Sequence, residues 1–179
     1  MIRVLENPLT KNYLDFKDFI TSPGFLWSHA KQNYSAGSHP AYFTHPFIVR
    51  ACENEVAPVP IIMCEHTQFV FAVVDEILKY NDRDINLVYR MNLNMTYAQD
   101  VENPYSPVHT DHVYPHENLL IYFTGHKQGE GGQIIVGDEE YYPKEDDVII
   151  FPGTPHYMKI PNKGFRVALV MTYLGGYTH

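Results

Sequence analysis

The stretch 85–97, INLVYRMNLNMTY, decides the predicted fold because hydrophobic side chains recur at every second position. Successive side chains of an extended strand point to opposite faces, so this alternation predicts one long strand with an apolar and a polar face. The alternating apolar set is Ile85, Leu87, Tyr89, Met91, Leu93, Met95 and Tyr97. A strand of this length indicates a large sheet around which the rest of the chain is organised.

The segments on either side of this strand differ in period. Further short strands are predicted at 119–124, 133–136, 147–151, 156–160 and 165–174, with turn sequences such as GEGG, VGDEE and PNKG between them. Two helices are predicted upstream. One lies within 9–24 and has Thr10 as its cap, and the other lies within 66–82 with a stripe of Phe69, Val73, Ile77 and Tyr80. Helices followed by many short strands favour an α+β chain built on an antiparallel sandwich or jelly-roll barrel.

Residues 33–60 are rich in Pro, Gly, Ser and His and have no sustained period. They predict a long loop that can include a short extended piece. Long irregular segments in compact domains often cover binding sites, so one hypothesis is a lid over the barrel mouth that contacts substrate. The alternative is an ordered wrap that only covers the helices, and the sequence does not decide between the two.

The composition bounds the class of protein. The 179 residues predict a single domain, and the 14 Tyr and 10 Phe favour a β-rich fold. A net charge of −8 disfavours a nucleic-acid binder. Cys52 and Cys64 have no CxxC spacing, which favours free thiols over a single disulfide. No apolar run approaches the roughly 18 residues of a membrane span, and no signal peptide is evident, so a soluble cytoplasmic protein is predicted.

Four residues form the candidate reactive constellation. His109 and Asp111 lie two positions apart, and His156 follows 45 residues after Asp111. Two imidazoles and one carboxylate suit Fe(II), although zinc accepts the same ligands. Arg166 begins a strongly apolar strand, where a cation is costly to bury unless it meets an anion. The alternative for Arg166 is a rim arginine paired with one of the protein's carboxylates.

Residues 85–174 resemble the core of the Fe(II)- and 2-oxoglutarate-dependent oxygenases. The likeness is closest to the prolyl 4-hydroxylase-like branch, in the short form met in phage and marine bacterial genomes. That family has a His-x-Asp pair, a distal His and an Arg about ten residues later, and 131–156, GGQIIVGDEEYYPKEDDVIIFPGTPH, is similar to its Gly-Gly, Pro-Lys, Phe-Pro and His succession. Phe123 and Thr124 depart from the usual Leu-Asn, and the N-terminal part matches no family motif.

The resemblance implies a fold and a site. The fold is α+β, with a double-stranded β-helix (jelly-roll) core at 85–179 and N-terminal helices packed on one sheet, so that 1–84 serve as helical and loop support. The implied metal ligands are His109, Asp111 and His156, and the implied cosubstrate-binding residues are Arg166, Tyr122 and Tyr97. Core packing is the alternative role for Tyr122 and for Tyr97.

The implied activity is hydroxylation of a peptidyl side chain, such as a prolyl residue, or of an amino-acid side chain. Fe(II) and 2-oxoglutarate would be required, succinate and CO2 would be co-products, and ascorbate is a candidate reductant for a cytoplasmic enzyme of the cell or of a phage's host. The alternatives are hydroxylation of a small metabolite and a non-catalytic, cupin-like metal-binding jelly roll. His112 and His116 are predicted to lie at the surface or to support the ligands. The remaining histidines are treated as structural or solvent-facing: His29, His39, His45, His66 and His126.

Overall fold

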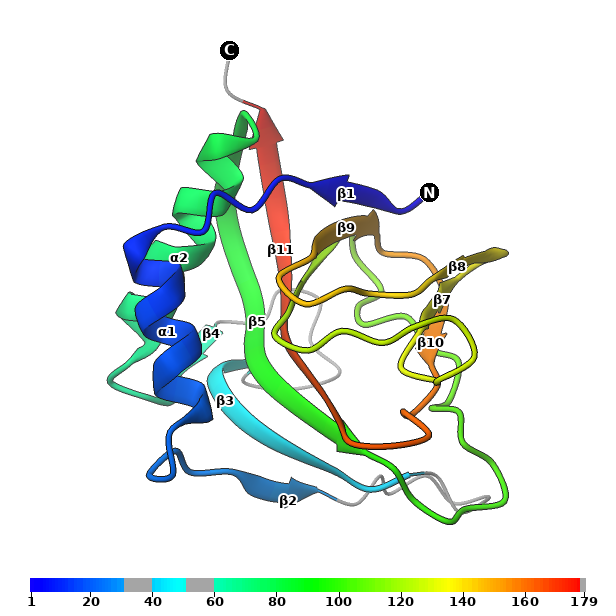
Figure 1. Cartoon of the computed structure of the whole chain (residues 1–179). Helices are drawn as coiled ribbons and strands as arrows, with labels where there is room; N and C mark the ends of the chain where they lie inside the picture. Colours follow the sequence, from blue (N-terminus) through cyan, green and yellow to red (C-terminus); the bar gives the residue numbers. More distant parts are fainter. Residues whose placement is uncertain (31–39, 51–59, 178–179) are drawn as a thin grey trace.

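The computed structural model describes residues 1–30, 40–50 and 60–177, which form mostly antiparallel β-sheet with two helices (Figure 1). In chain order the elements are β1 (Arg3–Leu5), α1 (Lys11–Thr21), β2 (Ser28–Ala30), β3 (Tyr42–Arg50), β4 (Pro60–Ile62), α2 (Thr67–Tyr80), β5 (Arg83–Tyr97), β6 (Glu117–Tyr122), β7 (Ile134–Val136), β8 (Glu139–Tyr141), β9 (Val148–Pro152), β10 (His156–Met158) and β11 (Phe165–Tyr177). The large sheet has the order β1-β9-β6-β11-β5-β3-β2, with β4 also paired to β3, and the small sheet has the order β10-β7-β8. Two sheets of this kind are consistent with a jelly-roll core.

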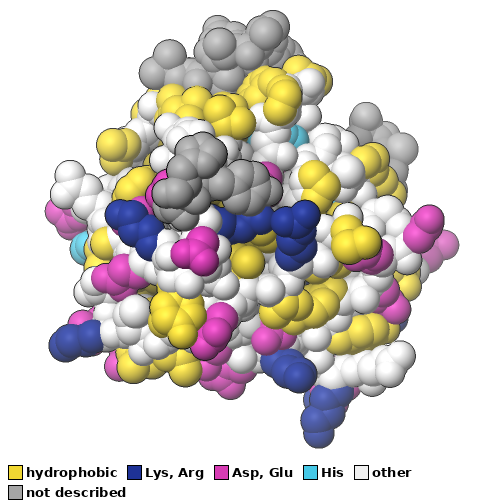
Figure 2. Space-filling model, turned by 90° about the horizontal axis from the view of Figure 1, so that it is seen from above, with side chains coloured by type: hydrophobic (Ala, Val, Ile, Leu, Met, Phe, Trp, Pro, Cys, Tyr) yellow, Lys and Arg dark blue, Asp and Glu magenta, His cyan; other side chains and the backbone are white. Residues whose placement is uncertain are grey.

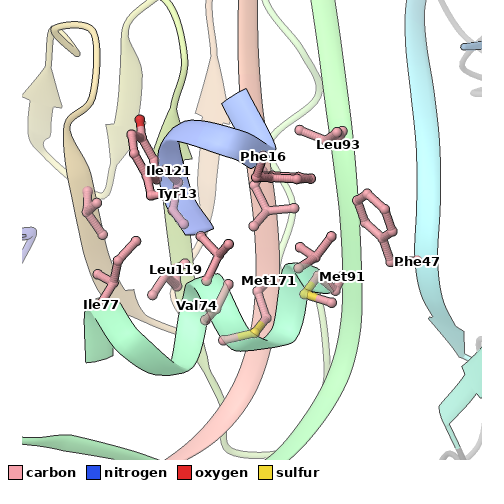
Figure 3. Packing of buried hydrophobic residues seen from close by; sticks show 14 of the residues in the cluster. Tyr13, Phe16, Phe47, Val74, Ile77, Met91, Leu93, Leu119, Ile121 and Met171 are labelled. Atoms are coloured by element: carbon pink, nitrogen blue, oxygen red, sulfur yellow. The ribbon is translucent and has the colours of Figure 1, made fainter. Parts of the chain in front are cut away.

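The two faces of the large sheet are covered differently. The helices lie on one side of β5 and β11, and the small sheet lies on the other (Figure 1). An outer core fills the space on the helix side, and Figure 3 shows side chains of α1, α2 and the sheet converging there. Its fully buried members include Tyr13, Phe16, Phe47, Val74, Ile77, Met91, Leu93 and Met171. An inner core lies between the two sheets and consists of Leu120, Tyr122, Ile134, Val136, Ile149, Phe151 and Ala168.

Both helices begin where the sequence predicts. In α1 the apolar positions Tyr13, Phe16 and Ile20 are buried, and the Thr10 side chain accepts a hydrogen bond from the Tyr13 amide, as expected of an N-cap. In α2 most of the predicted apolar positions are buried, but Tyr80 is 55% exposed. The prediction that Tyr80 belongs to the buried stripe is therefore wrong, and its hydroxyl donates to Glu6 at 3.1 Å instead.

Thr10 gives a direct test of how α1 is held. Its Oγ1 accepts from the Tyr13 amide at 3.2 Å and donates to Glu76 of α2 at 2.6 Å. Thr10→Ala should therefore lower the free energy of unfolding by about 1–2 kcal/mol, as other N-cap truncations do. Thr10→Ser keeps the hydroxyl and should retain most of the stability. Urea unfolding measures both variants, and equal losses in the two would show that the hydroxyl is not the stabilising group.

The long strand β5 keeps its predicted alternation only in its second half. Met91 and Leu93 are fully buried on the helix side, but the pairing of β5 with β11 shifts register between Thr172 and Tyr173. That β-bulge inverts the parity, so Val88 rather than Tyr89 joins the outer core. The sequence-based assignment of Tyr89 to the same face as Met91 is wrong for this reason.

The polar face of β5 is also covered. Asn92 and Thr96 are only 8% and 7% exposed, because the small sheet and its loops lie over this side. These polar residues therefore line the interior of the barrel instead of a solvated face.

The strand β3 corrects the predicted loop at 33–60. Residues 43–48 of β3 pair with β5 within the large sheet despite Pro46, which cannot donate a ladder hydrogen bond. On its other side, β3 pairs with β2 through 42–44 and with β4 through 48–50, so Pro46 falls between the two short partners. The pairing of β3 with β5 shifts register between Pro46 and Ile48. The proline is thus tolerated at a gap in the pairing.

Residues 1–84 consequently supply more than helices and loops, since they include four strands of the large sheet. A further strand, β8, lies where the sequence VGDEE predicted only a turn. The lid hypothesis for 33–60 falls partly on 33–39 and 51–59, which lie outside the described residues, as does Cys52. Cys64 is a free cysteine.

The outer surface has mixed charge. Figure 2 shows basic side chains interspersed with acidic and hydrophobic ones on the face seen from above. Within the described ranges, no helix is both long enough and apolar enough to cross a membrane.

Candidate functional site

Backbone pairing brings the two predicted histidine ligands together. His109 and His156 form an isolated antiparallel bridge in which each amide donates to the other's carbonyl, at 3.1 and 2.9 Å. Their rings lie side by side with centroids 4.5 Å apart. His109 lies in the connection between β5 and β6 and not in a regular strand. The two histidines are 47 positions apart in sequence, and this bridge pairs them directly.

Both imidazoles have the same ring nitrogen engaged. Nδ1 of His109 donates to the carbonyl of Pro107, and Nδ1 of His156 donates to the carbonyl of Thr154, each at 3.0 Å. When the proton of a neutral imidazole is on Nδ1, the free lone pair is on Nε2. A backbone carbonyl on the other ring nitrogen is the usual way in which proteins orient histidine ligands of metals.

Asp111 completes the cluster. One carboxylate oxygen of Asp111 and one nitrogen of each imidazole lie within 4.8 Å of one another. Asp111 and His156 are buried, whereas His109 is exposed. Burial alone would raise the pKa of Asp111, but the field of Arg90 and the nearby imidazoles lowers it, so the carboxylate is ionised at neutral pH. Burial lowers the pKa of His156, which keeps that imidazole neutral.

The donor set fits a hard or borderline divalent cation. Two neutral imidazoles and one carboxylate on one side of an ion leave further positions open, which is the ligand set of non-haem Fe(II) oxygenases. The structure therefore brings together all three residues that the sequence predicted as metal ligands.

Arg166 lies on the inner face of β11, the face that Ala168 contributes to the inner core. Its side chain is buried, and its Nε donates to the carbonyl of Gly132 at 3.1 Å while one Nη donates to the hydroxyl of Tyr122 at 3.3 Å. The guanidinium carbon also lies 5.0 Å from the centre of the Tyr122 ring. Among the described residues, no carboxylate forms an ion pair with Arg166. The rim arginine paired with a carboxylate is therefore not what the structure contains.

The inner core connects this cation to the histidine cluster. Tyr122 and Phe151 belong to the inner core, and the Phe151 ring packs edge-on against His156 at 5.1 Å. Arg166 is thus linked to His156 through Tyr122 and Phe151 of the inner core.

Two polar residues beside Arg166 were missed by the sequence reasoning. Thr96 is directly opposite Arg166 in the β5–β11 pairing, and its buried hydroxyl has no hydrogen-bond partner among the described residues. His126 has a buried Nε2 in the same condition, and burial together with the field of Arg166 lowers its pKa. For Thr96 the only signal in the sequence was its position on the polar face of β5, and for His126 there was none. Unsatisfied buried polar atoms around an unpaired cation indicate a site for a polar, anionic molecule.

Gly132 tests how tightly the chain packs around Arg166. It has a φ of +80°, and a Cβ there would lie 2.5 Å from the His126 ring, whereas Gly129, with a φ of +87°, has nothing within 4 Å. Both Gly→Ala changes should cost about 1–2 kcal/mol of unfolding free energy through the left-handed backbone. Gly132→Ala should cost more and should also displace the carbonyl that Arg166 binds. Urea unfolding of the two variants measures the difference, and equal losses would contradict the close approach.

Tyr97 lies apart from the other predicted cosubstrate-binding residues. Thr96 faces Arg166 across the strand pair, so the next residue, Tyr97, points to the opposite face of β5. Its ring packs against Phe43 of β3 at 5.7 Å. The structure brings together Tyr122 and Arg166 and does not bring Tyr97 to them.

His112 and His116 are buried, at 6% and 7% exposure, so the prediction of surface positions is wrong for both. Nε2 of His112 is 2.7 Å from the hydroxyl of Thr172 on β11, and its Nδ1 is 2.9 Å from the hydroxyl of Tyr114. The imidazole also stacks on the Tyr114 ring. His112 therefore anchors the segment next to Asp111 to the large sheet, which is the supporting role predicted as its alternative.

No protein-family model matches the sequence, and no curated protein matches it significantly. Solved structures are similar over nearly the whole chain. An oxidoreductase of the 2OG-Fe(II) (2-oxoglutarate and iron) oxygenase family from Burkholderia pseudomallei has a TM-score of 0.72 at 12% identity, covering 99% of this chain and 85% of its own. A prolyl hydroxylase from Trichoplax adhaerens, in complex with a peptide of hypoxia inducible factor, has a TM-score of 0.62 at 15% identity, covering 97% and 83%.

The α-ketoglutarate-dependent non-haem epimerase SnoN of nogalamycin biosynthesis has a TM-score of 0.56 at 9% identity, covering 99% of this chain and 81% of its own. At these identities the likeness establishes the fold. The chain has the fold of the 2OG-Fe(II) oxygenases, which the sequence resemblance implied.

Proposed function

We propose that this chain is a single-domain dioxygenase that depends on Fe(II) and 2-oxoglutarate. The observation that carries the proposal is Arg166, a buried guanidinium with no carboxylate partner among the described residues, which the inner core links to His156 of the His109–Asp111–His156 cluster. A buried cation needs an anion, and 2-oxoglutarate has one carboxylate to spare after chelating a metal.

His109, Asp111 and His156 would hold the iron. The two imidazoles have Nδ1 fixed by backbone carbonyls, and Asp111 carries the negative charge that a divalent cation needs. When bound, Fe(II) would supply the activation of dioxygen that oxidises 2-oxoglutarate to succinate and CO2 and oxidises the substrate. Ascorbate would serve as the reductant that keeps the iron divalent.

Arg166 and Tyr122 would hold the distal carboxylate of 2-oxoglutarate. Burial raises the pKa of Tyr122, so its hydroxyl stays protonated. That hydroxyl accepts a hydrogen bond from Arg166 and can donate its own proton to an incoming carboxylate oxygen. The guanidinium supplies the charge, and its planar fork can bind two oxygens at once.

For the substrate, we infer a peptidyl side chain, with a prolyl residue as the first candidate. The support is that one structural neighbour is a prolyl hydroxylase in complex with a peptide. A small-molecule substrate is the second candidate, because the same fold serves an epimerase of nogalamycin biosynthesis. The exposure of His109 suits either, since it leaves the metal site reachable from solvent.

A non-catalytic, cupin-like metal-binding protein is the competing class. A structural metal would use the same three ligands but would leave the buried charge of Arg166 without a purpose. Turnover of 2-oxoglutarate separates the two classes, because a structural site would not convert it to succinate.

The decisive experiment is an anaerobic titration of metal-free protein with Fe(II) and then with 2-oxoglutarate. Oxygen is admitted afterwards in the presence of ascorbate, and succinate is quantified. Stoichiometric binding of both, followed by succinate formation, is the expected result. Iron binding without 2-oxoglutarate binding would favour the structural metal site and contradict the proposed activity. A peptide library screened for a mass increase of one oxygen atom would then test the substrate class.

A further inference from the structure

The carboxylate of Asp111 has its two oxygens directed at different partners. Oδ1 is 3.1 Å from an Nη of Arg90, and Oδ2 is 3.4 Å from Nε2 of His156. The Asp111 side chain is only 2% exposed, so the carboxylate itself has little contact with water. One oxygen therefore faces the candidate metal site, and the other is directed at a guanidinium.

Arg90 reaches this carboxylate from the middle of the large sheet. It belongs to β5 and pairs with Thr172 of β11, and β5 is itself flanked by β11 and β3. Thr172 in turn contacts His112, the residue after Asp111, at 2.7 Å. The paired residues Arg90 and Thr172 thus contact the carboxylate of Asp111 and the imidazole of His112, respectively.

We propose that Arg90 is a positioning residue for the metal site, which holds Oδ1 so that Asp111 presents Oδ2 alone to the ion. The proposal rests on the proposed function, since it needs a metal at His109, Asp111 and His156. A carboxylate without such a partner can rotate or bind an ion through both oxygens. Two-oxygen binding would fill a coordination position that 2-oxoglutarate or dioxygen requires.

Two effects of Arg90 oppose each other. Its positive charge repels a bound divalent cation and lowers the affinity, whereas its contact fixes the ligand in place and raises the affinity. Outer-shell partners of metal ligands typically change metal affinity by about 10–100-fold when removed, and the change is a loss. The exposed fraction of the Arg90 side chain, 25%, leaves its charge partly solvated, so the repulsion is weakened and positioning should dominate.

The competing explanation is that Arg90 only neutralises a buried carboxylate. In that case the removal of Arg90 would destabilise the metal-free fold but would leave the metal affinity unchanged, or would raise it by removing a repelling charge. The two explanations therefore predict metal affinities that change in different directions.

Arg83 supplies a matched control. It lies on the same strand, is 6% exposed and forms an ion pair with Glu117 at 3.2 Å, and neither residue is in the candidate site. Arg83→Gln removes an ion pair of similar burial from β5. It should lower the melting temperature without changing metal affinity.

The test uses the metal-free full chain and Co(II), whose visible absorption reports the number of ligands. Arg90→Gln should weaken Co(II) binding by about 10–100-fold and should alter the absorption bands. Arg90→Lys keeps the charge without the planar fork and should recover part of the affinity. If Arg90→Gln does not fold, Arg90→Lys alone still distinguishes the explanations, because pure neutralisation predicts full recovery of affinity and spectrum.

A Co(II) affinity that is unchanged or raised in Arg90→Gln, with an unchanged spectrum in both Arg90 variants, would overturn the positioning role. Absence of Co(II) binding by the unmodified chain would instead overturn the metal site itself, and with it the proposed function.

Discussion

Asp111→Ala should abolish stoichiometric Fe(II) binding and succinate formation while the chain remains folded. The substitution removes the only anionic ligand of the cluster and leaves two neutral imidazoles, one of them exposed. Two histidines without a carboxylate do not make the facial ligand set of a non-haem iron site. The partner left behind, Arg90, is 25% exposed and can be solvated, so the loss of the ion pair should not unfold the chain.

The measurement is an anaerobic Fe(II) titration, with circular dichroism to confirm folding. Glu117→Gln is the matched control, because it removes a carboxylate from another arginine ion pair and should leave iron binding intact. His109→Ala and His156→Ala should each lose iron binding as well. Iron binding that is unchanged in Asp111→Ala would refute the assignment of the metal site.

The candidate metal ligands could be predicted from the sequence because the signal was in residue types and order. His109, Asp111 and His156 occur in the order of a known motif, and a backbone bridge between His109 and His156 helps to bring the three residues together. Arg166 followed from chemistry, since a cation at the start of an apolar strand needs a reason to be there. Neither inference required the register of any strand.

The failures depended on pairing and contacts between distant parts of the chain. Tyr89 left the predicted face because a β-bulge inverts the alternation, and a bulge has no clear signature in a single sequence. The strand β3, which contains Pro46, lies where a long loop was predicted, and the gap between β2 and β4 explains why the proline is tolerated. Residues such as His112 are buried by a loop that folds back onto β11, a long-range contact that local spacing cannot reveal.

The polar face of β5 shows a further limit of what strand alternation can predict. The alternation predicted which residues share a face, but not that the polar face would be enclosed. Arg90, Asn92 and Thr96 are polar because they border the space between the two sheets, where Arg90 meets Asp111. Pattern alone assigns faces to a strand, and the second sheet determines what each face contacts.

Arg166→Ala should weaken 2-oxoglutarate binding by about tenfold or more while leaving iron affinity near that of the unmodified chain. Hydrogen bonds to charged groups contribute about 1.5–3 kcal/mol, and each 1.4 kcal/mol is about a factor of ten in affinity. Arg166 is not within the group of candidate metal ligands, so iron binding has no reason to change. Arg166→Lys should recover part of the affinity, because it keeps the charge but loses the planar fork.

The measurement compares the apparent 2-oxoglutarate affinity of each variant with its melting temperature. If Arg166 has only a structural role, its removal should lower the melting temperature and change the 2-oxoglutarate affinity of the folded molecules little. Arg83→Ala is the matched control for that outcome, since Arg83 is also buried in the large sheet but pairs with Glu117 outside the candidate site. Arg166 has no such carboxylate among the described residues, so its removal should relieve a buried charge and cost less stability than the control. A 2-oxoglutarate affinity that is unchanged in Arg166→Ala would refute the cosubstrate role, whatever happens to the melting temperature.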